Sequence, residues 1–128
     1  MKKQAIIEEC FSLVGIAVSA LYFAYHQTMD ERWVYLPSIL LGVAWIVMWF
    51  RRKDFKQPEG FEPYWRRTNM ASSIGGLILA VIIYFAAKEA PEISSGVWVN
   101  FVAMGFILAH GSSLNYLYHR YLRATGKK

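Results

Sequence analysis

Few side chains in this sequence could take part in acid–base or ion-handling chemistry, and the most informative of them is His110. It lies near the centre of the apolar stretch 97–118. An ionisable side chain in the middle of a membrane-spanning segment is a candidate functional residue by default. Two interpretations follow for His110: a titrating or ion-binding group, or a neutral imidazole that shares a structural hydrogen bond with a serine of a neighbouring helix.

A stripe of polar and small residues runs through the first apolar stretch, 5–25. Steps of four and three residues connect its members, which are Glu8, Ser12, Gly15, Ser19, Tyr22 and His26. This spacing predicts a seam along one face of a helix. If Glu8 faces other polar groups, its carboxyl could carry a proton. The alternative is a carboxylate in the first turns of the helix that reaches the interface and interacts with the helix dipole.

Further polar residues lie in the second half of the stretch 97–118. Asn115 and His119 are four residues apart and approach its end, which indicates either a polar vestibule or a hydrated helix end. Taken with the first stripe, they define a candidate polar path through the molecule: Glu8, Ser12, Ser19, His110 and Asn115.

The distribution of histidine and cysteine argues against a cofactor or a metal. Bis-histidine haem ligation needs two imidazoles at one depth, whereas His26, His110 and His119 are expected at the outer end, centre and inner end of their helices. Cys10 is the only cysteine, so the chain can form neither a zinc site built from several thiolates nor an intrachain disulfide. No nucleophile-elbow motif or soluble domain is present to hold a Ser–His–acid triad. We therefore expect no cofactor, no metal, no catalytic residues and no enzymatic activity.

The elements that would position these residues are four apolar stretches in a chain of 128 residues, of which 55% are hydrophobic and 18% are charged. Each is close to the ~20 residues with which a helix crosses a hydrocarbon core ~30 Å thick. The sequence predicts an all-α integral membrane bundle that forms one domain over residues 1–128. Its four transmembrane helices are expected at about 5–25, 33–50, 70–87 and 97–118.

The positive charges predict the orientation. Of fourteen Lys and Arg residues, all but Arg32 and Lys88 lie at the amino terminus, in the loop 51–67 or in the carboxy-terminal tail. Because positive charge resists translocation, we expect both termini and the basic loop in the cytoplasm of a bacterial inner (plasma) membrane. The aromatic and basic loop would either lie on anionic lipid headgroups or extend as a solvated loop. The chain's basic character is therefore no sign of a nucleic-acid partner.

Small residues recur at helical spacing on every predicted helix. The glycines expected at helix-packing contacts are Gly15, Gly42, Gly76 and Gly105. Lipid gives helices no hydrophobic reason to associate, so small residues that allow close approach are the usual sign of an interface. Such faces fit a compact bundle, and they also fit a bundle that forms homo-oligomers or binds a larger membrane partner.

Short similarities relate the two halves of the chain. Tyr22-Phe23-Ala24 corresponds to Tyr84-Phe85-Ala86, and the next helix begins with Trp33-Val34 in one half and Trp98-Val99 in the other. The polar stripe of the first helix has a counterpart in Asn69, Ser73, Gly76 and Ala80. One interpretation is a duplicated helical hairpin whose copies share their orientation. The other is chance similarity in sequences of low complexity.

Two functions follow from these features. The first is a non-enzymatic accessory subunit or scaffold of the inner membrane, which packs against itself or against a larger partner. The second is a small oligomeric transporter or channel whose polar path follows the Glu8 stripe and His110. A cavity that reaches Glu8, Ser12, Ser19 or His110 would favour transport, whereas side chains that meet only protein atoms would favour the subunit.

Overall fold

The computed structural model describes residues 2–52 and 58–126, and within them it contains four helices and no strand. The helices are α1 (Lys2–Tyr25), α2 (Arg32–Phe50), α3 (Glu62–Glu89) and α4 (Ser95–Thr125). All four are long and apolar enough to cross a membrane. The expected all-α bundle of four transmembrane helices is confirmed, and the protein is an integral membrane protein.

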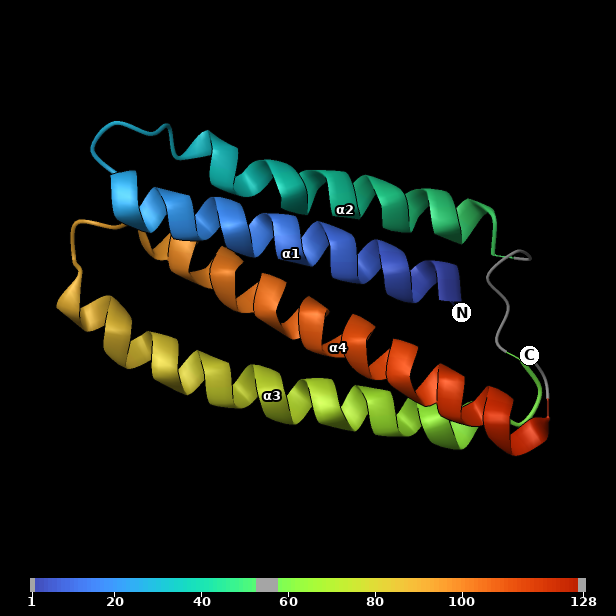
Figure 1. The fold of residues 1–128 in the computed structure, drawn as a ribbon. Coiled ribbons are helices and arrows are strands. Elements are labelled where there is room, and N and C mark those ends of the chain that lie inside the picture. Colours follow the sequence, from blue (N-terminus) through green and yellow to red (C-terminus); the bar gives the residue numbers. More distant parts are fainter. Residues whose placement is uncertain (1, 53–57, 127–128) are drawn as a thin grey trace.

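The helices lie side by side in the order α2, α1, α4, α3 (Figure 1). The central helices α1 and α4, which are the first and last in the sequence, pack against each other. On the outside, α3 packs on α4, and α2 packs chiefly on α1. Among the described residues, no Cα atom of α2 lies within 8 Å of one in α3, so their backbones stay apart. The start of α1, the end of α2, the start of α3 and the end of α4 share one end of the bundle (Figure 1), which we call the terminal end.

At the terminal end, α3 begins earlier than the predicted span 70–87. It starts at Glu62, with Pro63 in its first turn, where the missing N–H costs little. The second part of the predicted loop 51–67 is therefore helical and not a loop. Its expected contact with anionic lipid headgroups stays a prediction. Lys53 and Lys56 of that loop lie outside the described residues.

Aromatic packing explains why the extra turns of α3 are helical. Phe61 is fully buried and its ring contacts those of Tyr64, Tyr118 and Tyr121. The Tyr121 hydroxyl donates a hydrogen bond to the backbone carbonyl of Glu59 over 2.6 Å. Aromatic pairs of this kind add stability beyond the area that they bury. They fasten the beginning of α3 to α4, which extends to Thr125 rather than ending near Tyr118.

At the opposite end, two short connections join α1 to α2 and α3 to α4. The Ser94 side chain caps α4 by accepting a hydrogen bond from the backbone N–H of Gly96. Between α1 and α2, Arg32 donates hydrogen bonds to the Asp30 carboxylate, which lowers the pKa of that carboxyl. The Phe23 and Trp98 rings stack with their centroids 4.6 Å apart, joining α1 to α4.

The stripe predicted on the first helix is the buried face of α1. Its first five members, Glu8, Ser12, Gly15, Ser19 and Tyr22, are all buried. A Cβ atom at Gly15 would lie 2.5 Å from Sδ of Met104 on α4. A Cβ at Gly111, on the facing side of α4, would lie 3.1 Å from the backbone nitrogen of Glu9 and 3.2 Å from the carbonyl oxygen of Ala5. Backbone atoms cannot easily move aside, so Gly111 marks a close approach of α1 and α4.

The other glycines expected at packing contacts differ from one another. A Cβ at Gly76 would meet the Phe106 ring, and one at Gly105 would collide with the Leu79 side chain, so both lie in the α3–α4 contact. Gly42 does not lie at such a contact, because no atom lies within 4 Å of the position that its Cβ would occupy. The prediction for Gly42 is therefore wrong for packing within the chain. It sits on a part of α2 that no neighbouring helix covers.

The packing does not follow the internal repeat of the sequence. A duplicated hairpin would make α1 equivalent to α3 and α2 equivalent to α4, so the contact between α1 and α4 would have its counterpart between α3 and α2. That counterpart is missing among the described residues. On α3 the buried polar positions are Thr68 and Ser72, whereas Asn69 and Ser73 of the predicted stripe are exposed. The two halves are thus not packed as symmetric copies.

Candidate functional site

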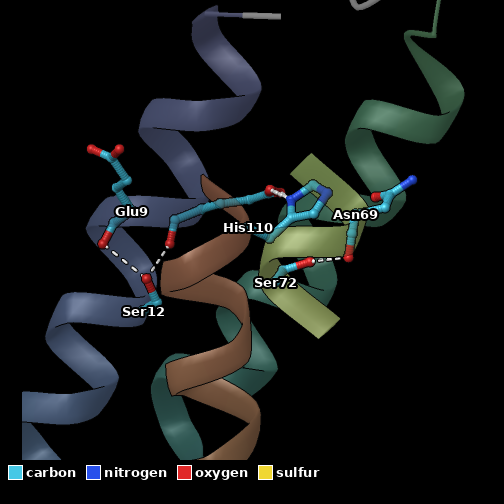
Figure 2. A network of polar contacts seen from close by, with 6 residues as sticks. Glu9, Ser12, Asn69, Ser72 and His110 are labelled. Carbon is cyan, nitrogen blue, oxygen red and sulfur yellow. Dashed lines mark hydrogen bonds and ion pairs between the residues drawn. The ribbon is translucent and has the colours of Figure 1, made fainter. Parts of the chain in front are cut away.

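Glu8 and His110 form a buried pair between the two central helices. Nδ1 of His110 lies 2.5 Å from Oε1 and 3.2 Å from Oε2 of Glu8. The Glu8 side chain is 2% exposed and that of His110 is 15% exposed. The dashed lines of Figure 2 mark this contact, in which α1 supplies the carboxylate and α4 the imidazole. The close approach at Gly111, the residue after His110, brings α1 within reach of the imidazole.

The first turns of α3 complete the surroundings of the imidazole. The Trp65 ring meets His110 edge to face, with a centroid distance of 5.3 Å. Asn69, one turn further along α3, lines the same hollow as His110, and its carbonyl oxygen accepts a hydrogen bond from Ser72 (Figure 2). Trp65 reaches this position only because α3 begins at Glu62.

The position of His110 near the bilayer midplane stays a prediction. We expected it there because His110 is central in the stretch 97–118. It is also the central residue of α4, with fifteen residues of Ser95–Thr125 on either side. Its neighbours Glu8 and Trp65 lie within the first two turns of α1 and α3. Along α1 and α3, the site is therefore nearer the terminal end than the opposite end.

A cavity of about 290 Å³ opens beside the pair. We call it the polar cavity, and its walls come from all four helices: Gln4, Glu8, Trp45, Trp65, Asn69, Phe106, Ile107 and His110. Its volume matches the lower limit of ~300 Å³ for small-molecule pockets. Glu8 and His110 therefore border a cavity as well as other protein atoms.

A second and larger hollow adjoins the polar cavity. This apolar groove, of about 670 Å³, runs along α4 between α2 and α3, and its walls are Trp45, Gly76, Ala80, Ile83, Tyr84, Ala87, Ser95, Trp98, Val99, Val102, Ala103, Phe106 and Ile107. Three residues line both hollows: Trp45, Phe106 and Ile107. The backbones of α2 and α3 stay apart, and the groove lies along α4 with Trp45 of α2 and several α3 residues in its walls.

The remaining members of the predicted polar path do not extend the cavity. Ser12 donates its hydroxyl to the backbone carbonyls of Glu8 and Glu9 within its own helix (Figure 2). The Ser19 hydroxyl and the Asn115 side-chain oxygen are buried and have no hydrogen-bond partner among the described residues. None of these three residues lines either hollow. A path along the Glu8 stripe is not what the structure shows, because close packing against α4 fills that face of α1.

The chemistry available at the site is that of a carboxylate and an imidazole sharing a hydrogen bond. When His110 is neutral, its Nδ1–H can donate to an ionised Glu8, and the pair carries one negative charge. When His110 is protonated the pair is neutral. Nε2, the second ring nitrogen, makes no hydrogen bond to a described residue, so it can accept a hydrogen bond or a proton in the neutral state.

Several residues of the site could not be identified in advance. Trp65 fell in a stretch expected to be a loop, and Trp45 and Phe106 resembled ordinary lipid-facing aromatics. Gln4 carried a usable signal, since it precedes Glu8 by four residues and so extends the polar face of α1 by one turn. Asn100 also carried a signal in the sequence, since it is a polar residue within the apolar stretch 97–118. In the structure its amide donates to the Val34 carbonyl over 3.1 Å, and its side-chain oxygen accepts from Ser38, which connects α4 to α2.

Comparisons with known proteins add no family to this description. No family model, no curated protein and no solved structure matches the chain. Within the described residues, no group of three or more His, Cys, Asp or Glu side chains could hold a metal ion. The class that the fold defines is a small polytopic membrane protein with a buried acid–imidazole pair beside a cavity.

Proposed function

We propose that the protein is a small oligomeric transporter or channel in which the Glu8–His110 pair binds and releases protons. The observation that carries this proposal is the position of the pair, buried between α1 and α4 yet lining the polar cavity. Ionisable residues inside a membrane are expensive, and they commonly mark ion pathways or proton relays. Imidazole is also the side chain that changes charge near neutral pH.

The location of the pair at the α1–α4 contact gives protonation a structural consequence. In a partly buried site, the attraction between an imidazolium and a carboxylate is much stronger than in water. Protonating Glu8 removes that attraction, and deprotonating His110 weakens it. Each change of proton occupancy therefore alters the force that holds α1 against α4 near Gly111, where the two helices pack closely.

The proposed orientation places this site toward the cytoplasm of a bacterial inner membrane. Four spans put both ends of the chain on one side of the membrane. The distribution of Lys and Arg supports the cytoplasm as that side. Positive charges near the terminal end, such as Arg52 and Arg67, would then face anionic lipid headgroups. A proton would reach the pair from the cytoplasmic interface.

Proton flux into liposomes tests the proposal. Purified protein is reconstituted with a pH-sensitive dye inside, and a potassium diffusion potential drives proton entry. We expect acidification at least about tenfold faster than in empty vesicles, and we expect Glu8→Gln and His110→Gln to abolish the difference because neither amide titrates. His119→Gln, at an exposed histidine, is the matched control and should keep the wild-type rate.

Wild-type flux equal to that of empty vesicles would contradict the proposal. So would flux that both variants at the pair retain, since protons would then move by another route.

A second candidate function, that of an accessory subunit or scaffold, is favoured by the uncovered face of α2. Gly42 has no neighbour within 4 Å of its Cβ position, and Ile39 and Ile46, on the same helix, are 61% and 58% exposed. A small residue among exposed apolar ones allows another helix to approach closely. Mass measurement in mild detergent separates the candidates: a stable complex with a different, larger protein, together with absent flux, would favour the subunit.

A further inference from the structure

The polar cavity and the apolar groove are neighbours along α4. Their walls share Trp45, Phe106 and Ile107, so these three side chains lie where the two hollows adjoin. From Ile107 the groove extends to Ser95, twelve residues along the helix, or about 18 Å. Its walls are almost entirely apolar, whereas the other end of the site carries the Glu8–His110 pair. The combined shape fits a molecule with a small polar head and one long apolar chain.

The charge of the polar end selects the type of head. Among the described residues that line the two hollows, Glu8 is the only Asp, Glu, Lys or Arg. With an ionised Glu8 and a neutral His110 the cavity holds one negative charge, and Nε2 of His110 is available as an acceptor. The aromatic side chains of Trp45, Trp65 and Phe106 also line the cavity. The amides of Gln4 and Asn69 can donate hydrogen bonds to an anion, but a carboxylate among aromatic rings favours a cation over an anion.

We propose that this site binds a cationic single-chain amphiphile of the alkylammonium class. The ammonium group donates a hydrogen bond to Nε2 of His110 and lies among the aromatic rings of the polar cavity, while its chain follows α4 along Val102 and Val99. This inference rests on the proposed function, since it names the substrate class of the same site.

Access to the site comes from the lipid. The backbones of α2 and α3 stay apart among the described residues, and the groove lies along α4 on this side of the bundle. An alkylammonium in the leaflet at the terminal end has its head toward that end and its chain in the core. The polar cavity and the groove follow each other in the same order along α4.

Binding of radiolabelled dodecylamine tests this inference. The full chain is placed in nanodiscs of zwitterionic lipid, whose headgroups carry no net charge, at pH 7, where the amine is charged. Uptake by empty nanodiscs is subtracted. We expect saturable binding, with dodecanol and dodecanoate at least about tenfold weaker as competitors. Tenfold corresponds to the ~1.4 kcal/mol that a charged contact or a cation–π contact can supply.

Two substitutions assign the two ends of the ligand. Glu8→Gln should weaken dodecylamine binding about tenfold and abolish the preference over dodecanol. Ala103→Trp fills the groove and should weaken binding about tenfold or more. Val43→Trp is the matched control, because Val43 is 53% exposed on α2 and lines neither hollow. It should bind like the wild type.

The comparison of the three competitors uses only the wild-type chain, so it stays decisive if a variant does not fold. Equal competition by dodecanol, preference for dodecanoate, absence of saturable binding or unchanged binding by a folded Ala103→Trp variant would each overturn the inference. Proton flux without amine binding would overturn this inference alone. Amine binding without proton flux would overturn the proposed function and leave this ligand class in place.

Discussion

At the scale of single residues, the central feature is a buried pair whose members depend on each other. Burying either charge alone is costly, and the partner offsets that cost only while the contact is intact. The pair connects α1 to α4 across 102 positions of the sequence. It therefore contributes to the bundle as well as to any chemistry, and the two contributions can be measured separately.

Removing the imidazole should destabilise the bundle through the carboxylate that it leaves behind. We expect His110→Ala to lower the free energy of unfolding by about 3 kcal/mol, because Glu8 is then buried without a partner. In the double variant Glu8→Gln/His110→Ala no charge is stranded, so its loss should be smaller than that of His110→Ala alone. Unfolding by denaturing detergent in mixed micelles measures both.

A His110→Ala variant as stable as the wild type would show that the pair contributes nothing to folding. If the free energy of unfolding of the double variant falls by the sum of the losses in Glu8→Gln and His110→Ala, the two residues do not interact.

At the scale of helices, the glycines differ in what surrounds them. The Cβ position at Gly111 is blocked by backbone atoms of α1, whereas the one at Gly15 meets the flexible end of Met104. Gly42 faces open space. Overpacking is costly where the neighbour cannot move and cheap where a flexible side chain can change its rotamer. The three positions therefore form a graded series for the same substitution.

Replacement by alanine should reproduce that series. We expect Gly111→Ala to cost about 1–3 kcal/mol by forcing α1 and α4 apart, Gly15→Ala to cost less, and Gly42→Ala to leave the stability of the monomer unchanged. Unfolding in mixed micelles again provides the measurement. Val14→Leu and Leu77→Ile, at residues that are 53% and 68% exposed, serve as controls for apolar changes on the lipid side. Equal losses at the three glycines would contradict the helix contacts described here.

At the scale of the whole molecule, the terminal end and the opposite end differ in charge and in connection length. The start of α1, the end of α2, the start of α3 and the end of α4 share one side (Figure 1), and most Lys and Arg residues lie at or next to these helix ends in the sequence. The short loops on the other side contain Asp30 and Glu92. Charge asymmetry of this kind determines orientation during insertion.

Reporter fusions test the orientation directly. Fusions after Lys56 and after Lys128 should be active with a cytoplasmic reporter, and a fusion at Glu92 should be active with a reporter that functions only outside, because the basic segments resist translocation. Activity of the outside reporter after Lys56 would mean that this loop crosses the membrane. The orientation would then be reversed, and the Glu8–His110 site would face outward.

The sequence by itself determined the class of this protein and the central part of each helix, because hydropathy and helical period act within one segment. Glu8 and His110 were identifiable as candidates for the same reason, and so was the buried face of α1. The contact between Glu8 and His110 was not identifiable, since it depends on how far α1 and α4 slide past each other, which close packing at Gly111 restricts. The early start of α3 and the place of Trp65 depended on the aromatic contacts between α3 and α4.

Only the tertiary structure decided where the hollow of the molecule lies. The polar stripe indicated a path along α1, yet that face is filled because its small residues allow α4 to pack tightly. The site opens instead beside α4, where α2 and α3 remain apart. Which helices touch is a property of the whole bundle, set by competition among all the apolar faces, and no periodicity within a single helix specifies it.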